Sequence, residues 1–173
     1  MTEFSRRYRL DALSAEPRRV RIEADVEERA ALAARFGLAA LDSLAAEAQL
    51  SRRGDGVSAA GVVTARVTQS CIATAEPIEQ HVEEPFRIEF RPPPEGRADE
   101  EVELGEEELD VHFHEGGAID LGEAAAQTLA LALDPYPRSP AADSALKAAG
   151  VKSEEEARAE TSPFAVLKGL KAD

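Results

Sequence analysis

Residues 61–90, GVVTARVTQSCIATAEPIEQHVEEPFRIEF, decide the fold, because two strand-like runs flank a single turn. β-branched residues fill the first run, and apolar and polar residues alternate in the second, as in half-buried strands. The pair Glu76-Pro77 interrupts them, since proline disfavours the helical conformation in the residue before it. The stretch therefore predicts a β-hairpin within an antiparallel sheet.

The flanking sequence extends this hairpin into a larger sheet. Alternation resumes upstream, and a glycine-rich connection at residues 53–56 predicts a meander of strands at about 45–53, 57–70 and 78–91. Further strands are expected at 4–10, 19–24 and 111–114. The leucines at positions 38, 41 and 44 recur at helical spacing and predict a short turn of helix before the meander.

Two segments carry helix signals. Asp25 precedes a run that ends before Gly37, which predicts a helix over 26–36 with Val26, Ala30, Ala33 and Phe36 as its buried stripe. Asp120 is the expected N-cap of a second helix over 121–133. The fold class is therefore α+β, an antiparallel meander of about five to six strands packed with two main helices.

One domain is expected over residues 1–135. A proline- and acid-rich stretch that begins at residue 91 predicts an extended, mobile acidic loop within it. Residues 136–173 are expected to form a Pro/Ala/charged tail, disordered or with a marginal helix at 154–160, and to end in a docking segment at 162–171.

Composition places the chain in a reducing compartment. The 173 residues include one cysteine, which cannot form an internal disulfide, and no apolar run fits a secretory signal or a membrane span. We therefore expect a cytoplasmic protein with no membrane partner.

The net charge is −14, and the acidic excess falls between residues 71 and 135. Non-specific nucleic-acid affinity comes mainly from Lys and Arg, so this charge argues against a DNA-binding protein. An RNA contact would need a local basic face; the alternative is that the same arginines are solvated on strand faces. The candidates are Arg6, Arg7, Arg9, Arg18, Arg19, Arg21, Arg52, Arg53 and Arg66.

The acidic run 100–110 has two interpretations as well. It is either a solvated, self-repelling loop or a docking segment for a basic protein, with contacts from Glu106, Glu107 and Glu108.

No catalytic constellation is present in the sequence. Cys71 has no basic neighbour in sequence to lower its pKa, so a structural thiol is favoured over a reactive one. Glu76 is expected to accept hydrogen bonds from backbone amides of the turn. His112 and His114 share a strand face and, with Cys71 or His81, could in principle ligate a metal, but exposed strand histidines are the favoured interpretation. We predict no enzymatic activity, no cofactor and no metal.

Several of these segments, in this order, resemble the YceD family of bacterial large ribosomal RNA subunit accumulation proteins. They are the strand at 61–67, the turn QSCIATAEPI at 69–78, the strand through Phe86 and Phe90, the helix after Ile119-Asp120-Leu121 with DPYP at 134–137, and PFAVL at 163–167. Cys71, Thr74, Glu76 and Pro77 form the family-motif turn.

The resemblance implies a non-enzymatic role in 23S ribosomal RNA synthesis, processing or stability and in large-subunit assembly. It implies a large-subunit rRNA precursor or a ribosomal protein as partner. The alternative is an acidic interaction module that binds a basic ribosomal protein and affects rRNA only indirectly.

Many relatives carry Cys-x-x-Cys at this turn and further cysteines near the C-terminus, whereas this chain has Thr74 and no later cysteine. A structural zinc site needs four nitrogen or sulfur ligands, so the metal binding proposed for the family is not expected here.

Overall fold

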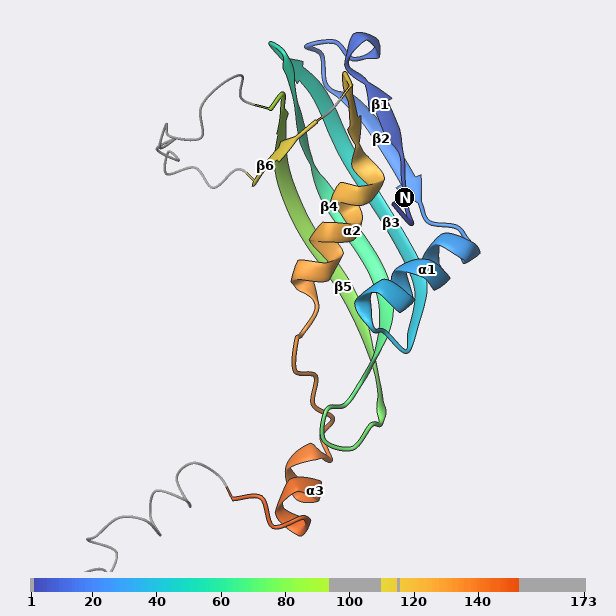
Figure 1. The fold of residues 1–173 in the computed structure, drawn as a ribbon, viewed down its shortest axis with the longest axis vertical. Coiled ribbons are helices and arrows are strands. Elements are labelled where there is room, and N and C mark those ends of the chain that lie inside the picture. The colour runs from blue at the N-terminus through green and yellow to red at the C-terminus, as the bar shows by residue number, and fades with distance from the viewer. Residues whose placement is uncertain (1, 94–109, 115, 153–173) are drawn as a thin grey trace, which may run out of the picture. The chain divides into compact units, whose positions relative to one another are not determined.

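The computed structural model describes residues 2–93, 110–114 and 116–152 and has the predicted α+β fold. Five strands form one sheet in the order β2-β3-β4-β5-β6, and β1 and β7 form a second sheet of two strands. In chain order the elements are β1 (Arg7–Arg9), a 3-10 turn (Leu10–Ala12), β2 (Arg18–Glu23), α1 (Val26–Phe36), β3 (Ala40–Arg53), β4 (Gly56–Ser70), β5 (Pro77–Arg91), β6 (Asp110–Phe113), β7 (Ala118–Asp120), α2 (Leu121–Ala132) and α3 (Ala142–Ala148) (Figure 1).

The chain divides into two compact units. The larger unit comprises Met1–Gln69 and Glu79–Pro135, and the smaller unit comprises Ser70–Ile78 and Tyr136–Asp173. The proposal of one domain over 1–135 followed by a tail stays a prediction. The predicted acidic loop beyond residue 93 and the helices expected at 154–160 and 162–171 lie outside the described residues.

The predicted meander is confirmed. β3 pairs antiparallel with β2 on one side and with β4 on the other, in the registers Val20↔Ala48 and Gln49↔Ala60. Gly56 at the start of β4 lies against the backbone of Phe90 near the end of β5, so these two strands also run antiparallel. β6 adds a short edge strand that is parallel to β5.

The helical turn expected at residues 38–44 is wrong, because β3 already begins at Ala40. The register of β3 with β4 shifts between Leu41 and Ser43. Such an irregularity adds a residue to one strand, so Leu41 and Leu44 both face the core although they are three residues apart. A β-bulge therefore produced the spacing that had indicated a helix.

Both main helices pack on one face of the five-stranded sheet. The predicted bounds 26–36 of α1 are confirmed, with a capping box between Asp25 and Glu28 and a left-handed C-cap at Gly37. The predicted stripe is only partly right, because Val26 is 71% exposed and Leu32 is the fully buried residue. α2 contributes most of the helical core, with Leu121, Ala125 and Leu129 entirely buried, and lies across the sheet in Figure 1.

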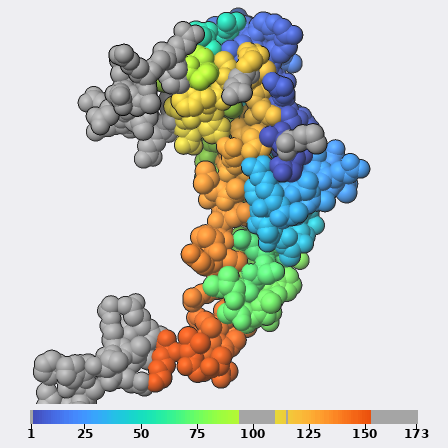
Figure 2. Space-filling model, viewed as in Figure 1, coloured from blue at the N-terminus to red at the C-terminus, as the bar shows by residue number. Residues whose placement is uncertain are grey.

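The surface of the larger unit on this side is formed largely by α1, α2 and the segment that carries β6 and β7, which hide most of the sheet (Figure 2). On the opposite face, the alternate positions of each strand are exposed or half-buried. We call this surface the open face; it includes a hollow of about 480 Å³. The hollow is lined in part by Arg19, Gln49, Ala60, Val62 and Thr64.

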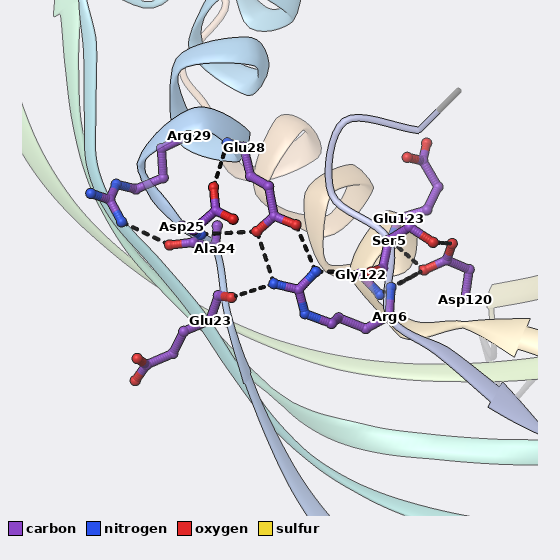
Figure 3. A network of polar contacts seen from close by, with 10 residues as sticks. All are labelled: Ser5, Arg6, Glu23, Ala24, Asp25, Glu28, Arg29, Asp120, Gly122 and Glu123. Atoms are coloured by element: carbon purple, nitrogen blue, oxygen red, sulfur yellow. Dashed lines mark hydrogen bonds and ion pairs between the residues drawn. The ribbon is translucent and has the colours of Figure 1, made fainter.

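Asp120 joins the N-terminal segment to α2 (Figure 3). Its carboxylate caps the helix by accepting from the backbone N–H groups of Gly122 and Glu123, at 3.0 and 3.2 Å. It also accepts from the backbone N–H of Arg6 at 2.8 Å and from the hydroxyl of Ser5. One side chain therefore satisfies four donors from two segments that are more than a hundred residues apart in sequence.

Arg6 extends this network to α1. Its guanidinium donates to both carboxylate oxygens of Glu28, at 2.6 and 2.8 Å, and to the backbone carbonyl of Glu23 at 2.9 Å (Figure 3). The hydrogen bond from Arg6 lowers the pKa of Glu28. The N-terminal segment also passes so close to α2 that a Cβ on Gly122 would lie 2.7 Å from the carbonyl oxygen of Phe4.

Three smaller differences from the sequence-based expectation remain. The strand expected over 4–10 is restricted to β1, and Phe4 is buried in the core instead. The segment expected to lead into α2 also forms β7, which pairs with β1. Helix α3 lies where disorder was expected; Ala142, at its start, is buried. Among the described residues, no helix is long and apolar enough to span a membrane.

We expect Asp120→Ala to lower the free energy of unfolding by about 2 kcal/mol, because it removes a helix cap and leaves further donors without an acceptor. Asp120→Asn keeps the oxygen that accepts from all three backbone N–H groups, so it should cost less than half as much. Urea unfolding of the two variants measures the difference. Equal losses would show that the backbone contacts of Asp120 are not what stabilises the fold.

Candidate functional site

The predicted motif turn lies in the smaller unit and is closed by its own backbone. The N–H of Cys71 donates to the carbonyl of Glu76, and the N–H of Ala75 donates to the carbonyl of Cys71, both at 2.8 Å. Ala75 has a positive φ of 59°, a backbone conformation that non-glycine residues seldom adopt. The turn places the side chain of Cys71 in a buried position, with 3% of the residue exposed.

A second segment of the smaller unit packs against this turn. The N–H of Ser139 donates to the sulfur of Cys71 at 3.3 Å, and the N–H of Ile72 donates to the carbonyl of Pro137 at 3.0 Å. The hydroxyl of Ser139 donates to the carboxylate of Glu76 at 2.8 Å and lies 3.3 Å from the hydroxyl of Thr74. Cys71, Thr74, Glu76 and Ser139 together are called the cysteine cluster below.

The structure thus brings together three of the four predicted turn residues, and Pro77 follows them as the first residue of β5. Ser139 was not predicted. It lies 68 residues from Cys71 in sequence, and its contact to the sulfur uses a backbone N–H, which leaves no trace in residue type.

The predicted role of Glu76 is wrong in detail. Its carboxylate accepts from the hydroxyl groups of Thr74 and Ser139, at 3.0 and 2.8 Å, and not from backbone amides. The backbone carbonyl of Glu76 closes the turn instead. The hydroxyl groups of Thr74 and Ser139 therefore connect the Glu76 carboxylate to the residues that surround the Cys71 sulfur.

Hydrogen bonds lower the pKa of Cys71 to about 6. The largest contribution comes from the backbone N–H of Ser139 and the next from the hydroxyl of Thr74, whose single hydrogen is shared between the sulfur and the Glu76 carboxylate, while burial acts in the opposite direction. The sequence-based argument had required a basic neighbour for such a shift, and neutral donors provide it instead. At neutral pH the cluster favours a thiolate that is largely shielded from solvent.

We expect the thiolate ultraviolet absorbance of the only cysteine to titrate with a midpoint near 6. The folded pKa is depressed, so the resulting stabilisation is fully present above the pKa of the unfolded thiol and is lost as the pH falls through about 6. Thr74→Val removes one donor and should raise the midpoint.

Ser144→Ala is the control for this titration, because it removes a hydroxyl in α3 whose recorded hydrogen bond goes to the carbonyl of Ala141. A midpoint at the ordinary value of a free thiol in the unchanged protein would contradict the assignment.

The residues around Cys71 do not fit the structural metal site that the resemblance had raised as a possible role. Around the sulfur of Cys71 stand the two hydroxyl groups of Thr74 and Ser139, and hydroxyls are not among the usual protein ligands of zinc. Within the described part of the chain, no three side chains of His, Cys, Asp or Glu form a group able to hold a metal ion. Hydrogen bonds, rather than bonds to a metal ion, hold the cysteine cluster together.

We expect the native protein to be purified with zinc far below one equivalent. Replacing the two hydroxyl residues in Thr74→Cys/Ser139→Cys would place three sulfurs beside Glu76, a donor set that zinc accepts. The double variant should therefore bind zinc tightly, as measured by metal analysis after dialysis. Thr74→Ser/Ser139→Thr, which keeps the hydroxyls, is the control, and stoichiometric zinc in the native protein would contradict this prediction.

The arginines predicted to contact RNA fall into two groups. Four are engaged within the protein: Arg6 with Glu28, Arg9 with Asp11, Arg21 with Glu23 and Glu47, and Arg52 with the carbonyls of Gly54 and Leu10. Among the described residues, the side chains of the other five have no hydrogen-bond or ion-pair partner; they are Arg7, Arg18, Arg19, Arg53 and Arg66. Glu106, Glu107 and Glu108 lie outside the described residues.

The histidines differ from the expectation of exposed strand residues. His114 is 9% exposed and its Nε2 lies 3.2 Å from the carbonyl oxygen of Asp55, while the ring of His112 packs edge-on against Phe90. Both belong to the larger unit, whereas Cys71 belongs to the smaller one.

The structure defines a small α+β protein with an antiparallel meander, an open sheet face and a hydrogen-bonded cysteine turn. The family model described as large ribosomal RNA subunit accumulation protein YceD matches residues 59–171, which is more than half of the chain. The chain therefore belongs to this family. Comparison with curated proteins and with solved structures gives no match.

Proposed function

We propose that this protein is a non-enzymatic factor that supports the accumulation of 23S ribosomal RNA, through its synthesis, processing or stability, and thereby assembly of the large subunit. Membership of the family named for accumulation of large-subunit RNA carries this proposal. Such a role would be exercised in the cytoplasm, on an rRNA precursor or on a ribosomal protein bound to it.

Unpaired arginines on the open face support direct contact with RNA. Arg19 and Arg66 lie on this face because they alternate with buried residues of β2 and β4, and Arg87 alternates in the same way in β5. None of the three forms an ion pair with another residue that the structure describes. The open face therefore offers cationic groups that no acid in the described part of the chain neutralises.

The acids of the same face are partly neutralised. Arg21 pairs with Glu23 and Glu47, at 2.5 and 3.1 Å, and Arg91 pairs with Glu89. Glu83 also lines the hollow and is a remaining acidic residue there. This separation of paired and unpaired charge supports the proposal that a chain with a net charge of −14 offers arginines to phosphates on the open face.

The alternative remains an acidic interaction module that binds a basic ribosomal protein through Glu106, Glu107 and Glu108. It predicts binding that needs no RNA, and neutralising these three residues should weaken it. The experiment below separates the two.

We expect Arg19→Gln/Arg66→Gln to weaken binding of the protein to 23S rRNA fragments. Each arginine that contacts a phosphate releases counterions, so losing two contacts should reduce the slope of log affinity against log salt by about 1.4 on single-stranded RNA. In cells that carry only this variant, the ratio of 23S to 16S rRNA should fall toward that of cells lacking the protein.

Arg9→Gln/Arg35→Gln is the matched control, because it removes the same charge from arginines of β1 and α1, which lie away from the open face and are already paired with acids. Equal salt slopes for the two double variants would exclude the open face. An unchanged 23S to 16S ratio in cells lacking the protein would refute the proposed function itself.

A further inference from the structure

The open face offers hydrogen-bonding side chains to a partner. Its two central strands, β3 and β4, have 14 and 15 residues, so they are about 45 to 50 Å long (Figure 1). Short polar side chains recur along them on this face and form no hydrogen bond with any residue that the structure describes; they are Gln49, Ser51, Ser58, Thr64 and Thr68. The face therefore presents free hydroxyl and amide groups along much of its length.

Arginines without an ion-pair partner among the described residues lie beside these groups. Arg19 of β2 is in register with Gln49, which is in turn in register with Ala60. Arg19, Gln49 and Thr64 all line the hollow of about 480 Å³. Arg66 follows Thr64 two positions further along β4, on the same face. The six residues from Ala60 to Arg66 span about 20 Å, so cationic groups stand at two separated places with polar groups between them.

The acids that line the hollow are compatible with an RNA ligand. Glu47 is paired with Arg21 at 3.1 Å. Glu83 forms no ion pair within the described part of the chain. A carboxylate repels phosphate but accepts a hydrogen bond from an amino group, and guanine presents such a group in the minor groove of a helix. The hollow therefore suits the edge of base pairs better than it suits a phosphate.

The open face has few aromatic rings on which bases could stack. The phenylalanines of β5 are Phe86 and Phe90, and both are buried in the core. His81 of β5 and Phe113 of β6 present rings on the open side, but neither lines the hollow. Single-stranded RNA is recognised largely by stacking of unpaired bases on aromatic side chains, whereas an RNA helix is recognised through its phosphates and 2′-hydroxyl groups. The composition of the face favours the helix.

We propose that the open face binds base-paired RNA through its minor groove, with the hollow against 2′-hydroxyl groups and guanine edges and with Arg19 and Arg66 on phosphates. The minor groove of an RNA helix is wide and shallow and displays 2′-hydroxyls, which both donate and accept hydrogen bonds. The free hydroxyl and amide side chains of the face match them. The inference deepens the proposed function and rests on it, because base-paired segments of an rRNA precursor are the ligand.

Fluorescence anisotropy of the full chain with an RNA duplex of about 16 base pairs tests the proposal. The RNA duplex should bind about tenfold more tightly than the DNA duplex of the same sequence, which has no 2′-hydroxyl groups. It should also bind about tenfold more tightly than either of its single strands, which have no minor groove.

Thr64→Val tests the contact with the 2′-hydroxyl groups. Valine keeps the branched shape that strands favour and removes only the hydroxyl, so the sheet should be retained. Binding to the RNA duplex should weaken about fivefold, the effect of one neutral hydrogen bond, while binding to the DNA duplex should not change. Thr128→Val is the matched control, because the hydroxyl of Thr128 donates to the carbonyl of Ala124 within α2, away from the open face.

Three results would overturn the inference: equal affinity for the RNA and DNA duplexes, single strands that bind as tightly as the duplex, or an equal effect of Thr64→Val and Thr128→Val. Capture of a basic ribosomal protein without binding to any nucleic acid would overturn it as well.

Two further outcomes separate this inference from the proposed function. Duplex binding by a protein whose loss leaves the ratio of 23S to 16S rRNA normal would refute the proposed function alone. A 23S defect in cells lacking the protein, with no binding to the RNA duplex, would refute this inference alone.

Discussion

The hydrogen bonding of the Asp120 carboxylate is the constraint on which the rest of the larger unit depends. Its position at the N-terminus of α2 lets the negative charge interact with the helix dipole and with amides that have no partner within the helix. The same carboxylate holds the N-terminal segment, and Arg6 then ties that segment to the first turn of α1. Both helices and the buried Phe4 are thus positioned through one acceptor.

The sequence correctly predicted the elements whose conformation depends on residues close together in the chain. The capping residues Asp25 and Asp120 located both main helices, and alternation located the meander. The errors arose where a distant partner decides the conformation. The bulge near Leu41 depends on pairing with β4, and the register of β1 depends on β7. The turn residues of the cysteine cluster were predicted as a group, but the packing of Ser139 against them was not. Ser139 contacts the turn through its backbone N–H as well as its hydroxyl, and a backbone contact cannot be predicted from residue type.

The roles of individual charged residues were harder to predict from the sequence than the fold was. The nine candidate arginines could not be told apart in the sequence, yet Arg6 forms an ion pair inside the protein. Arg19 and Arg66 lie on the open face without an ion-pair partner among the described residues. Similarly, an absence of basic residues around Cys71 predicted an ordinary thiol, whereas N–H and O–H donors lower its pKa. In both cases the deciding quantity is the direction of a few hydrogen bonds, which residue type and spacing do not encode. The buried Nδ1 of His114, which has no hydrogen-bond partner among the described residues, is a further case.

The pairing of β1 with β7 also bears on the order of events during synthesis. Arg7 faces Asp120 across the two-stranded sheet, so the beginning of the chain cannot reach its final position until residue 120 has left the ribosome. At translation rates of about 5 to 20 residues per second, the N-terminal segment waits on the order of ten seconds. The meander of β3 and β4, whose contacts are nearer in sequence, can form during this interval. The hydrogen bonds between Asp120 and the N-terminal segment therefore form among the last steps in the folding of the larger unit, after the meander has formed.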